Sequence, residues 1–259
     1  MIYPIALAIC SLLVAALEAF APRRPEQRQL RPTLWTDLVM LVFNGHFLGV
    51  GLYLLSTKWI LPPIDRVLGP HLYRNVAAHW PLWLQVATVL LVMDFAQWCI
   101  HNLLHRVSWL WEFHKVHHSV VDGEMDWIVS FRFHWMEAVI YKTLQYLPLA
   151  FFGFSATAAL THAIVGTLIG HLNHANLDLG HGPWRYLVNN PRMHLWHHDY
   201  DAPPGKARNF GIIFSCWDYL FGTAHVPDGP PRKLGFPGVE SFPHNFFTSS
   251  LWPLQRLKK

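Results

Sequence analysis

Charged residues are scarce in this sequence, since Lys, Arg, Asp and Glu make up 14% of its 259 residues. Soluble domains carry about a quarter, so a fully water-exposed surface is not expected. The three cysteines, Cys10, Cys99 and Cys216, lie far apart, which argues against a disulfide framework and against a zinc ribbon. The net charge of +4 includes no basic stripe, so no nucleic-acid partner is expected.

Apolar and aromatic residues are abundant instead. Hydrophobic residues make up 52% of the chain, with 13 Trp and 17 Phe, which is typical of a protein in contact with lipid. Five segments are predicted as spanning or re-entrant helices: residues 2–20, about 36–56, about 81–105, about 137–152 and 156–174. The fourth is short, so the number of full spans is four or five. A turn is expected at Gly153, and an irregular loop through Pro62, Pro63, Gly69 and Pro70.

The distribution of Lys and Arg predicts the orientation. No basic residue precedes the first segment and Arg23 and Arg24 follow it, which indicates a retained anchor with its N-terminus outside. The cytoplasmic side then collects most basic residues, including all nine from Arg185 onward, and the external side keeps Lys58, Arg66 and Arg74. This threading agrees with the positive-inside rule.

The predicted fold is therefore all-α: a polytopic membrane bundle of about four to five spanning or re-entrant helices with a cytoplasmic, histidine-rich cap. We expect N-terminal anchor helices and an external loop in residues 1–80, a catalytic region in residues 81–225 and a cytoplasmic tail in residues 226–259. Residues 245–257 combine apolar side chains with basic ones and are predicted to lie in the membrane interface, although Pro253 is unfavourable in a helix.

Eight histidines fall into three clusters at helical spacing. The first is an H-x-x-x-H pair, and the word H-x-x-H-H then occurs twice; the residues are His101, His105, His114, His117, His118, His194, His197 and His198. Positions i, i+3 and i+4 share one face of a helix, so each cluster can direct its imidazoles at one spot. Single histidines are usually structural, but three clusters on the predicted cytoplasmic side indicate a metal site.

Further residues are candidates for the same site. His171 and His174 lie at i, i+3 near the end of the fifth segment, and ten imidazoles on two metals would leave one position open on each octahedral ion. Asp94 lies on one stripe with His101 and His105 and is predicted to orient an imidazole, with a hydrogen bond inside the bundle as the alternative. His134 and Glu137 form a polar group at the membrane boundary, and His162 either lines a pocket or packs in the core.

These words resemble the fatty acid hydroxylase/sterol desaturase superfamily of integral-membrane, histidine-rich enzymes. Other matching words begin at Arg132, His174, Pro191 and Asn209, and the last is Trp217-Asp218-Tyr219-Leu220-Phe221-Gly222-Thr223. Together they cover about residues 90 to 225. Three positions depart from the usual pattern: Trp135 replaces proline, Trp98 replaces tyrosine and Asn102 replaces arginine. None of the departures removes a ligand, so they concern the shape of the pocket.

The resemblance implies two iron ions that activate dioxygen and attack an unactivated C–H bond of a membrane lipid. It also implies electrons from NAD(P)H through a separate carrier, such as a cytochrome b5-, ferredoxin- or reductase-like protein. Asp94 and Asn209 are its predicted catalytic residues besides the metal ligands. A short chain without a fused electron carrier suggests a bacterial enzyme of the inner membrane, with the histidines on the cytoplasmic side.

Other functions remain open from the residues alone. Imidazole binds iron, copper, nickel and zinc alike. A histidine-lined metal transporter is the first alternative, although its ligands should lie near the midplane of several helices. A zinc-dependent membrane hydrolase is the second, although no His-Glu-x-x-His word is present. Within the superfamily, hydroxylation, desaturation and ether cleavage of a fatty acyl chain, a sterol or an alkylglycerol are not distinguished.

Overall fold

The structure is a computed structural model that describes residues 2–72, 75–180, 182–202 and 206–256. These residues form helices joined by loops, and their extended pairing is limited to three isolated β-bridges. The α-helices are α1 (Ile2–Phe20), α2 (Leu34–Val42), α3 (Leu48–Leu55), α4 (Leu61–Leu72), α5 (Leu82–Arg106), α6 (Ser108–His118), α7 (Trp135–Phe152), α8 (Ala156–His174), α9 (Pro191–His197), α10 (Cys216–Leu220) and α11 (Phe246–Arg256). The π-turns are η1 (Phe43–Phe47) and η2 (Ser56–Ile60), and the 3-10 turns are η3 (Val76–His79), η4 (Trp127–Phe131), η5 (Gly182–Tyr186) and η6 (Val239–Ser241). The predicted all-α class is confirmed.

Three helical runs are long and apolar enough to cross a membrane: Ile2–Phe20, Leu34–Val67 and Leu82–Arg106. Their outer faces carry large exposed apolar side chains such as Leu12 and Trp59, which water would disfavour and lipid accommodates. The chain is therefore an integral membrane protein. Helices α7 and α8, of 18 and 19 residues, both pack against α5. That α7 and α8 also cross the bilayer stays a prediction.

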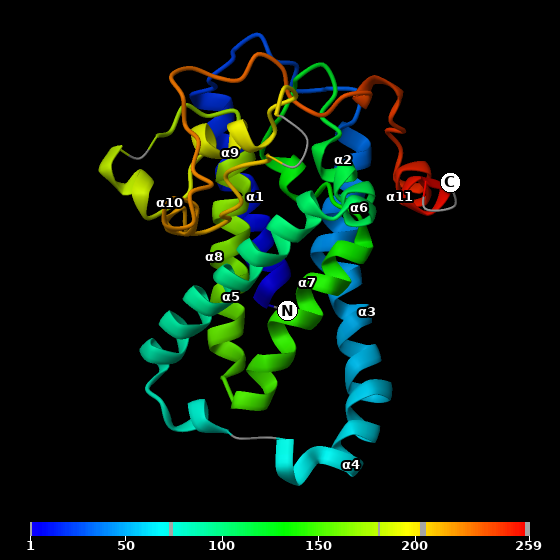
Figure 1. Ribbon diagram of the computed structural model, residues 1–259, viewed down its shortest axis with the longest axis vertical. Coiled ribbons are helices and arrows are strands. Elements are labelled where there is room, and N and C mark those ends of the chain that lie inside the picture. The colour runs from blue at the N-terminus through cyan, green and yellow to red at the C-terminus, as the bar shows by residue number, and fades with distance from the viewer. Residues whose placement is uncertain (1, 73–74, 181, 203–205, 257–259) are drawn as a thin grey trace.

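The second membrane run is longer than the sequence predicts. The expected loop at Pro62, Pro63 and Gly69 is instead helical, because η2 leads directly into α4. Pro62 and Pro63 lie at the start of α4, directly after the π-turn η2. The run therefore extends past the predicted end at Ser56 and forms the long arm seen beside the bundle in Figure 1.

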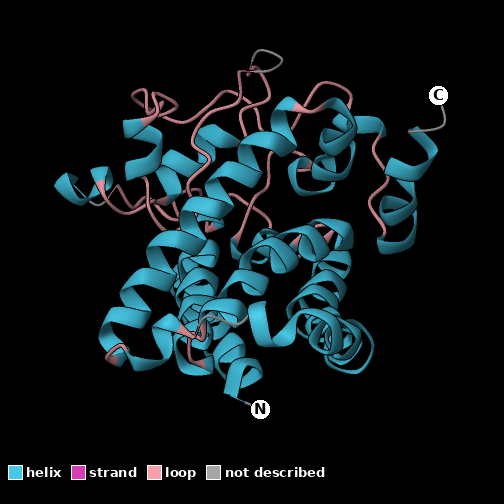
Figure 2. Cartoon of the chain, turned by 60° about the horizontal axis from the view of Figure 1, so that its bottom comes forward, coloured by secondary structure: helices cyan, strands magenta, loops and turns pink. Residues whose placement is uncertain are grey.

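The centre of the molecule is built from α1, α5, α7 and α8. Helix α8 packs against both α1 and α5, and α5 also contacts α7. At one end, α6 and α9 lie across the ends of α5 and α8 (Figure 1). Most loops gather at this same end, as Figure 2 shows. We call this end the cap.

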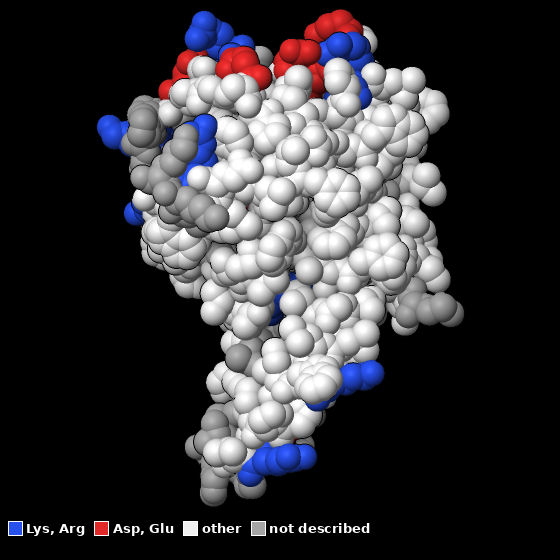
Figure 3. Space-filling view, turned by 90° about the vertical axis from the view of Figure 1, so that its right-hand side faces the viewer, with Lys and Arg blue, Asp and Glu red and all other residues white. Residues whose placement is uncertain are grey.

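The charged residues mark the two ends of the bundle. Lys, Arg, Asp and Glu crowd the top of the view in Figure 3, where the cap loops lie, and a few basic residues mark the opposite end. The surface between carries few charged side chains. This pattern is the one expected of a protein that spans a membrane.

Local signals fix the helices that carry the site. Ser155 accepts a hydrogen bond from Ala158 N at the start of α8, and Asn190 does the same for Met193 N at the start of α9. Gly153 ends α7 at φ 74°, and a Cβ there would lie 2.9 Å from the Asn75 Cα, so the predicted turn needs glycine.

The C-terminal segment forms α11, which packs against α6 and α2. Pro253 lies inside the helix and is buried, while Phe247 and Leu251 are exposed. A position in the membrane interface stays a prediction. Residues 257–259, which the predicted tail includes, lie outside the described residues.

Candidate metal centre

Helices α5, α6, α8 and α9 bring eight histidines together at the cap end of the bundle. The histidines form two groups in which the ligand nitrogens all lie within 4.8 Å of one another. The first group is His101, His105, His114 and His197, and the second is His117, His174, His194 and His198. Seven of the eight are buried, and His105 is partly exposed. Such a set of imidazoles, with no carboxylate among the grouped ligands, suits a transition metal in each group.

Each H-x-x-H-H word supplies both groups, which the spacing alone does not predict. His114 belongs to the first group and His117 to the second, because the two side chains leave α6 about 60° apart. His118 belongs to neither group of four but lies between them. Its Nε2 is 3.1 Å from His197 Nε2, and its ring centroid is 4.4 Å from that of His198.

The hydrogen bonds of the histidine rings show which ring nitrogens carry a lone pair that can bind a cation. His101 Nδ1 donates to the Phe210 carbonyl at 2.8 Å, and His114 Nδ1 donates to the Glu137 carboxylate at 2.7 Å. A neutral imidazole has one N–H, so both Nε2 atoms carry lone pairs. These two Nε2 atoms nevertheless lie 3.1 Å apart. Two facing lone pairs repel each other, and a metal ion between them removes the conflict.

The second group has the same arrangement. His117 Nδ1 donates to the Arg132 carbonyl at 3.0 Å and His174 Nδ1 to the Gly170 carbonyl at 2.7 Å. The two Nε2 atoms are 3.2 Å apart, and His194 Nε2 is 2.9 Å from His174 Nε2. Both groups therefore present converging lone pairs, and the residues fit a metal ion in each.

Protonation would prevent metal binding, and the surroundings oppose it. Burial lowers the pKa of His114, His117, His194 and His197 well below the ordinary value, and the neighbouring imidazoles lower it further. The rings are thus neutral at physiological pH, which is the form that binds metals.

A layer of polar side chains holds these rings in place. Glu137 accepts from His114 Nδ1 at 2.7 Å and also caps α7 by accepting from the backbone N–H of His134 at 3.3 Å. His134 itself donates through Nε2 to the Ser250 carbonyl at 2.8 Å, so its role is structural. The Arg132 guanidinium donates to Asp37 on α2 at 2.5 Å. Asp37 was missed in the sequence because nothing near it in the chain indicates its partner.

The structure does not bring His171 to the metal groups. Its Nδ1 lies 2.6 Å from Ser130 Oγ and its Nε2 lies 3.1 Å from Ser11 Oγ. Its ring packs edge-on against Trp127. Position 171 lies about 60° around α8 from position 174 and faces α1 instead of α6 and α9. The ten-ligand set predicted from the sequence is therefore not assembled, whereas His174 lies where it was expected.

Asp94 does not orient an imidazole. Its carboxylate accepts from Ile213 N at 2.8 Å, Phe214 N at 3.0 Å and Trp217 Nε1 at 3.0 Å. The alternative reading, a hydrogen bond inside the bundle, describes it better. Asp94 holds the loop that contains Ile213 and Phe214, which we call the cap loop, against α5. It acts on the site through that loop.

Asn209 also holds the loop and does not touch a ring. It adopts φ 58°, and its side chain donates to the carbonyls of Met193 and His225. Beside it, Asp218 accepts from Phe210 N at 2.9 Å and from Trp98 Nε1 at 3.0 Å. The loop thereby aims the Phe210 carbonyl at His101, so the predicted catalytic residues Asp94 and Asn209 are positioning residues in this geometry.

Two cavities reach the histidines from opposite sides. One of about 450 Å³ lies between α1, α5, α7 and α8 and contacts His101, His114, His117 and His174. Most of its wall is apolar and is formed by the helices of the bundle. The other, of about 440 Å³, lies in the cap and contacts His105, His118 and His197.

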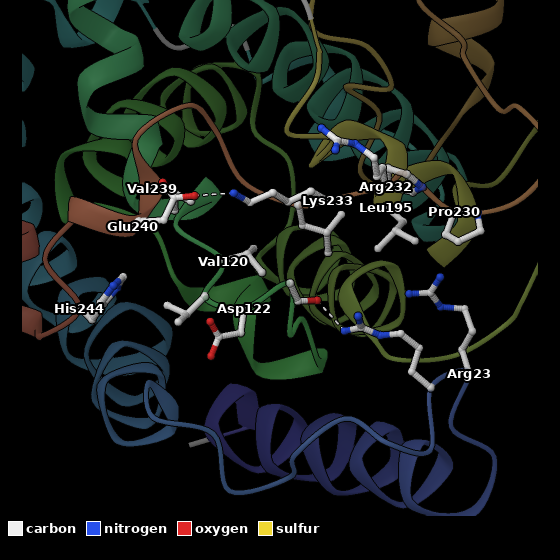
Figure 4. A pocket seen from close by; sticks show the side chains of 15 residues that line it. Arg23, Val120, Asp122, Leu195, Pro230, Arg232, Lys233, Val239, Glu240 and His244 are labelled. Atoms are coloured by element: carbon white, nitrogen blue, oxygen red, sulfur yellow. Dashed lines mark hydrogen bonds and ion pairs between the residues drawn. The ribbon is translucent and has the colours of Figure 1, made fainter.

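A third pocket of about 480 Å³ lies among the cap loops and contains none of the ten predicted ligands (Figure 4). Arg23 and Arg232 line one side of it, and Lys233 is paired with Glu240 across another. It is therefore separate from the candidate metal centre.

The fold and these groups define an all-helical membrane protein with two adjacent histidine sites. Residues 86–223 match the family model described as fatty acid hydroxylase. This is more than half of the chain, so the chain belongs to the fatty acid hydroxylase family, and the resemblance stated from the sequence is confirmed. No solved structure matches the chain significantly.

Curated relatives include the ornithine lipid hydroxylase OlsE of Rhizobium tropici, which is 35% identical over 152 residues, covering 58% of this chain and 45% of that protein. The cholesterol 25-hydroxylase-like protein of Danio rerio is 29% identical over 203 residues, covering 74% and 72%. The alkylglycerol monooxygenase of Homo sapiens is 27% identical over 137 residues, covering 51% and 28%. The matched part thus spans less than half the length of the first and third of these relatives.

Proposed function

We propose that this protein is a membrane di-iron, O2-dependent oxidoreductase that hydroxylates an unactivated C–H bond of a lipid. The observation that carries the proposal is the pair of four-histidine groups at the end of an apolar cavity. Family membership supports iron as the metal, and the named hydroxylases and monooxygenases among the relatives support the reaction. Desaturation and ether cleavage use the same kind of site and are separated by the experiment below.

The groups would hold one iron ion each, with His118 between them. An iron pair bound there supplies the activation of dioxygen that attack on such a C–H bond requires. Glu137 and the Phe210 carbonyl fix the two rings of the first group that border the cavity, His114 and His101, in one orientation. The Arg132 and Gly170 carbonyls do the same for the second group.

The cavity between α1, α5, α7 and α8 would hold the lipid. Its wall is formed by bundle helices and is largely apolar, so a hydrocarbon chain that enters it leaves no water beside the reacting carbon. The four histidines that border it would hold the reacting bond at the end of the cavity nearest the cap. The cap cavity, on the other side of the groups, is suited to the passage of water and protons, since Arg106, Asp199 and Tyr200 line it.

Electrons would come from NAD(P)H through a separate carrier of the cytochrome b5, ferredoxin or reductase class. The positions of the basic residues support a cytoplasmic cap, as the positive-inside rule requires. Both groups lie together at one end of the bundle. A transporter would instead be expected to hold its ligands near the midplane, so this placement favours an enzyme.

The test is lipid mass spectrometry on host membranes that contain the wild type or His197→Ala, under ¹⁸O2. A lipid that gains one labelled oxygen only with the wild type would establish a hydroxylase and identify its substrate class. Loss of two hydrogens without label would indicate a desaturase, and release of a fatty aldehyde would indicate ether cleavage. Identical lipids in a host that supplies iron and electrons would contradict the proposal.

A further inference from the structure

The third pocket, of about 480 Å³ among the loops of the cap, combines an apolar wall with basic side chains. Its apolar residues include Val120, Leu195 and Leu234, which pack in one hydrophobic cluster. Four basic residues line it as well: Arg23, Arg24, Arg232 and Lys233. The described residues that line it include none of the grouped histidines. A pocket of this volume is typical of a site for a small molecule.

Two of the four basic side chains are neutralised within the chain. Lys233 forms an ion pair with Glu240, which Figure 4 draws as a dashed line. Arg232 forms an ion pair with Asp201, with 3.1 Å between its Nε and a carboxylate oxygen. These two pairs add no net charge to the pocket, so its charge balance depends on the remaining residues.

Arg23 and Arg24 have no carboxylate partner among the described residues. The Arg23 side chain forms no hydrogen bond or ion pair with any of them. Arg24 donates to neutral oxygens, among them the Gly123 carbonyl at 2.5 Å, and its Nε is buried without an acceptor. Asp122, the other carboxylate that lines the pocket, pairs with Arg28 instead, at 2.7 Å. Two guanidinium groups at this pocket therefore carry charge that the chain itself does not balance.

The position of Arg23 is unfavourable for a cation unless an anion is bound. Its side chain is half-buried, and burial lowers its pKa, as does the neighbouring Arg24 cation. The charges of Asp178 and Glu26 offset this effect only in part. The Asp178 carboxylate itself pairs with Arg192 at 2.6 Å. An anion in the pocket would offset both the burial and the repulsion.

The chemistry of two guanidinium groups indicates which anion fits. Each group carries one positive charge and a planar fork of N–H donors that matches the oxygens of a carboxylate or a phosphate. A carboxylate balances one of the two charges. A phosphomonoester carries a charge of about −1.5 to −2 at neutral pH and offers three acceptor oxygens. The apolar wall is suited to contact with the carbon skeleton of the ester.

We propose that this pocket binds a phosphomonoester group, with Arg23 and Arg24 as its counter-ions. Figure 4 shows the Arg23 side chain extending toward Pro230, at the wall of the pocket. The same phosphomonoester chemistry occurs in soluble esters and in the headgroup of phosphatidic acid, and the experiment distinguishes these sources. The pocket is separate from the metal centre, so the inference does not depend on the proposed function.

The test measures binding to the full-length protein in phosphatidylcholine nanodiscs. The soluble probes are glycerol 3-phosphate and inorganic phosphate, measured by calorimetry, with glycerol as the uncharged counterpart. The lipid probe is phosphatidic acid in the nanodisc, measured by native mass spectrometry, with diacylglycerol as its phosphate-free counterpart. The variants are Arg23→Gln, Arg23→Lys and Arg24→Gln. The matched control is Arg185→Gln, which removes an exposed cation of the cap outside the pocket.

We expect at least one phosphate probe to bind in preference to its phosphate-free counterpart, and Arg23→Gln and Arg24→Gln each to weaken that binding about tenfold. Arg23→Lys keeps the charge without the planar fork, so its loss should be smaller than that of Arg23→Gln. Arg185→Gln should bind like the wild type. Binding of phosphatidic acid alone would identify a lipid headgroup, and binding of a soluble probe alone would identify a soluble ester.

The proposal is wrong if no phosphate probe binds, or if both Arg23→Gln and Arg24→Gln bind as tightly as the wild type. The second result would also be given by phosphate that binds at the metal centre. Equal weakening in Arg23→Gln and Arg185→Gln would contradict the proposal too, because it would show a response to surface charge alone. Arg23→Gln should keep the melting temperature of the wild type, since this side chain forms no hydrogen bond within the described residues.

Discussion

Removal of the Glu137 carboxylate should weaken metal binding without unfolding the protein. Glu137 is 1% exposed and accepts a hydrogen bond from His114 Nδ1 at 2.7 Å. A buried donor that loses its hydrogen-bond partner costs about 1–3 kcal/mol, and every 1.4 kcal/mol is about tenfold in an equilibrium constant. Loss of such a partner to a ligating histidine typically costs about 10–100-fold in metal affinity.

Two substitutions should give a graded result. Glu137→Gln keeps an acceptor oxygen for the His114 N–H but replaces the carboxyl group, so we expect a loss of about tenfold. Glu137→Ala leaves the His114 N–H without a partner, so we expect a loss of about a hundredfold. The assay is Fe²⁺ binding by the purified protein against a competing chelator, with metal content measured by mass spectrometry. Glu240→Gln is the control, since Glu240 pairs with Lys233 at the surface.

Unchanged iron affinity in both Glu137 variants would refute the reasoning, because it would mean that His114 does not bind metal through Nε2. A loss of helical circular dichroism would instead point to the second role of Glu137, in capping α7. The backbone N–H of His134 is the group left free in that case. Thermal melting of each variant separates the two causes.

Three further predictions follow from the same geometry. His105→Ala should lower the iron content from two ions to about one per chain, because His105 belongs to one group only; loss of both ions would show that the groups do not bind independently. His171→Phe should keep the metal content of the wild type and lower the melting temperature, because the Ser11 and Ser130 hydroxyls lose their partner; depleted metal would return His171 to the ligand set. Gly211→Ala should destabilise the cap by several kcal/mol, since an added Cβ would lie 2.3 Å from the Phe214 carbonyl oxygen; a melting curve like that of the wild type would show that the loop can move aside.

Features set by local sequence were predictable. The limits of α1 and α8 agree with the predicted segments because a continuous apolar run, Ser155 and Gly153 mark their ends. The eight clustered histidines were recognisable because their spacing is repeated. The continuation of the second membrane run through Pro62 was not predictable from the sequence, because nothing in the sequence of the π-turn η2 separates it from a loop.

Features that depend on distant contacts were not predictable. Asp94 meets Ile213, which lies 119 residues away, and only the folded chain shows that the carboxylate faces a loop and not a ring. His171 has the same spacing from His174 as His114 has from His117, yet serines from α1 and η4 occupy both of its ring nitrogens. Spacing along a helix shows which side chains can converge, whereas the neighbouring helices decide which of them do.

The division of each H-x-x-H-H word between two groups has a consequence for the chemistry. Because α6 and α9 each supply ligands to both groups, a shift of either helix changes both sites together. The Nε2 atoms of His118 and His197, one from each H-x-x-H-H word, lie 3.1 Å apart. The Arg208 carbonyl in the cap loop accepts a hydrogen bond from His197 Nδ1 and so fixes this ring. The loop that Asp94 and Asp218 hold in place thereby positions His101 and His197 of the first group through the Phe210 and Arg208 carbonyls. This positioning explains why so many buried hydrogen bonds are made by a loop that contributes none of the grouped ligands.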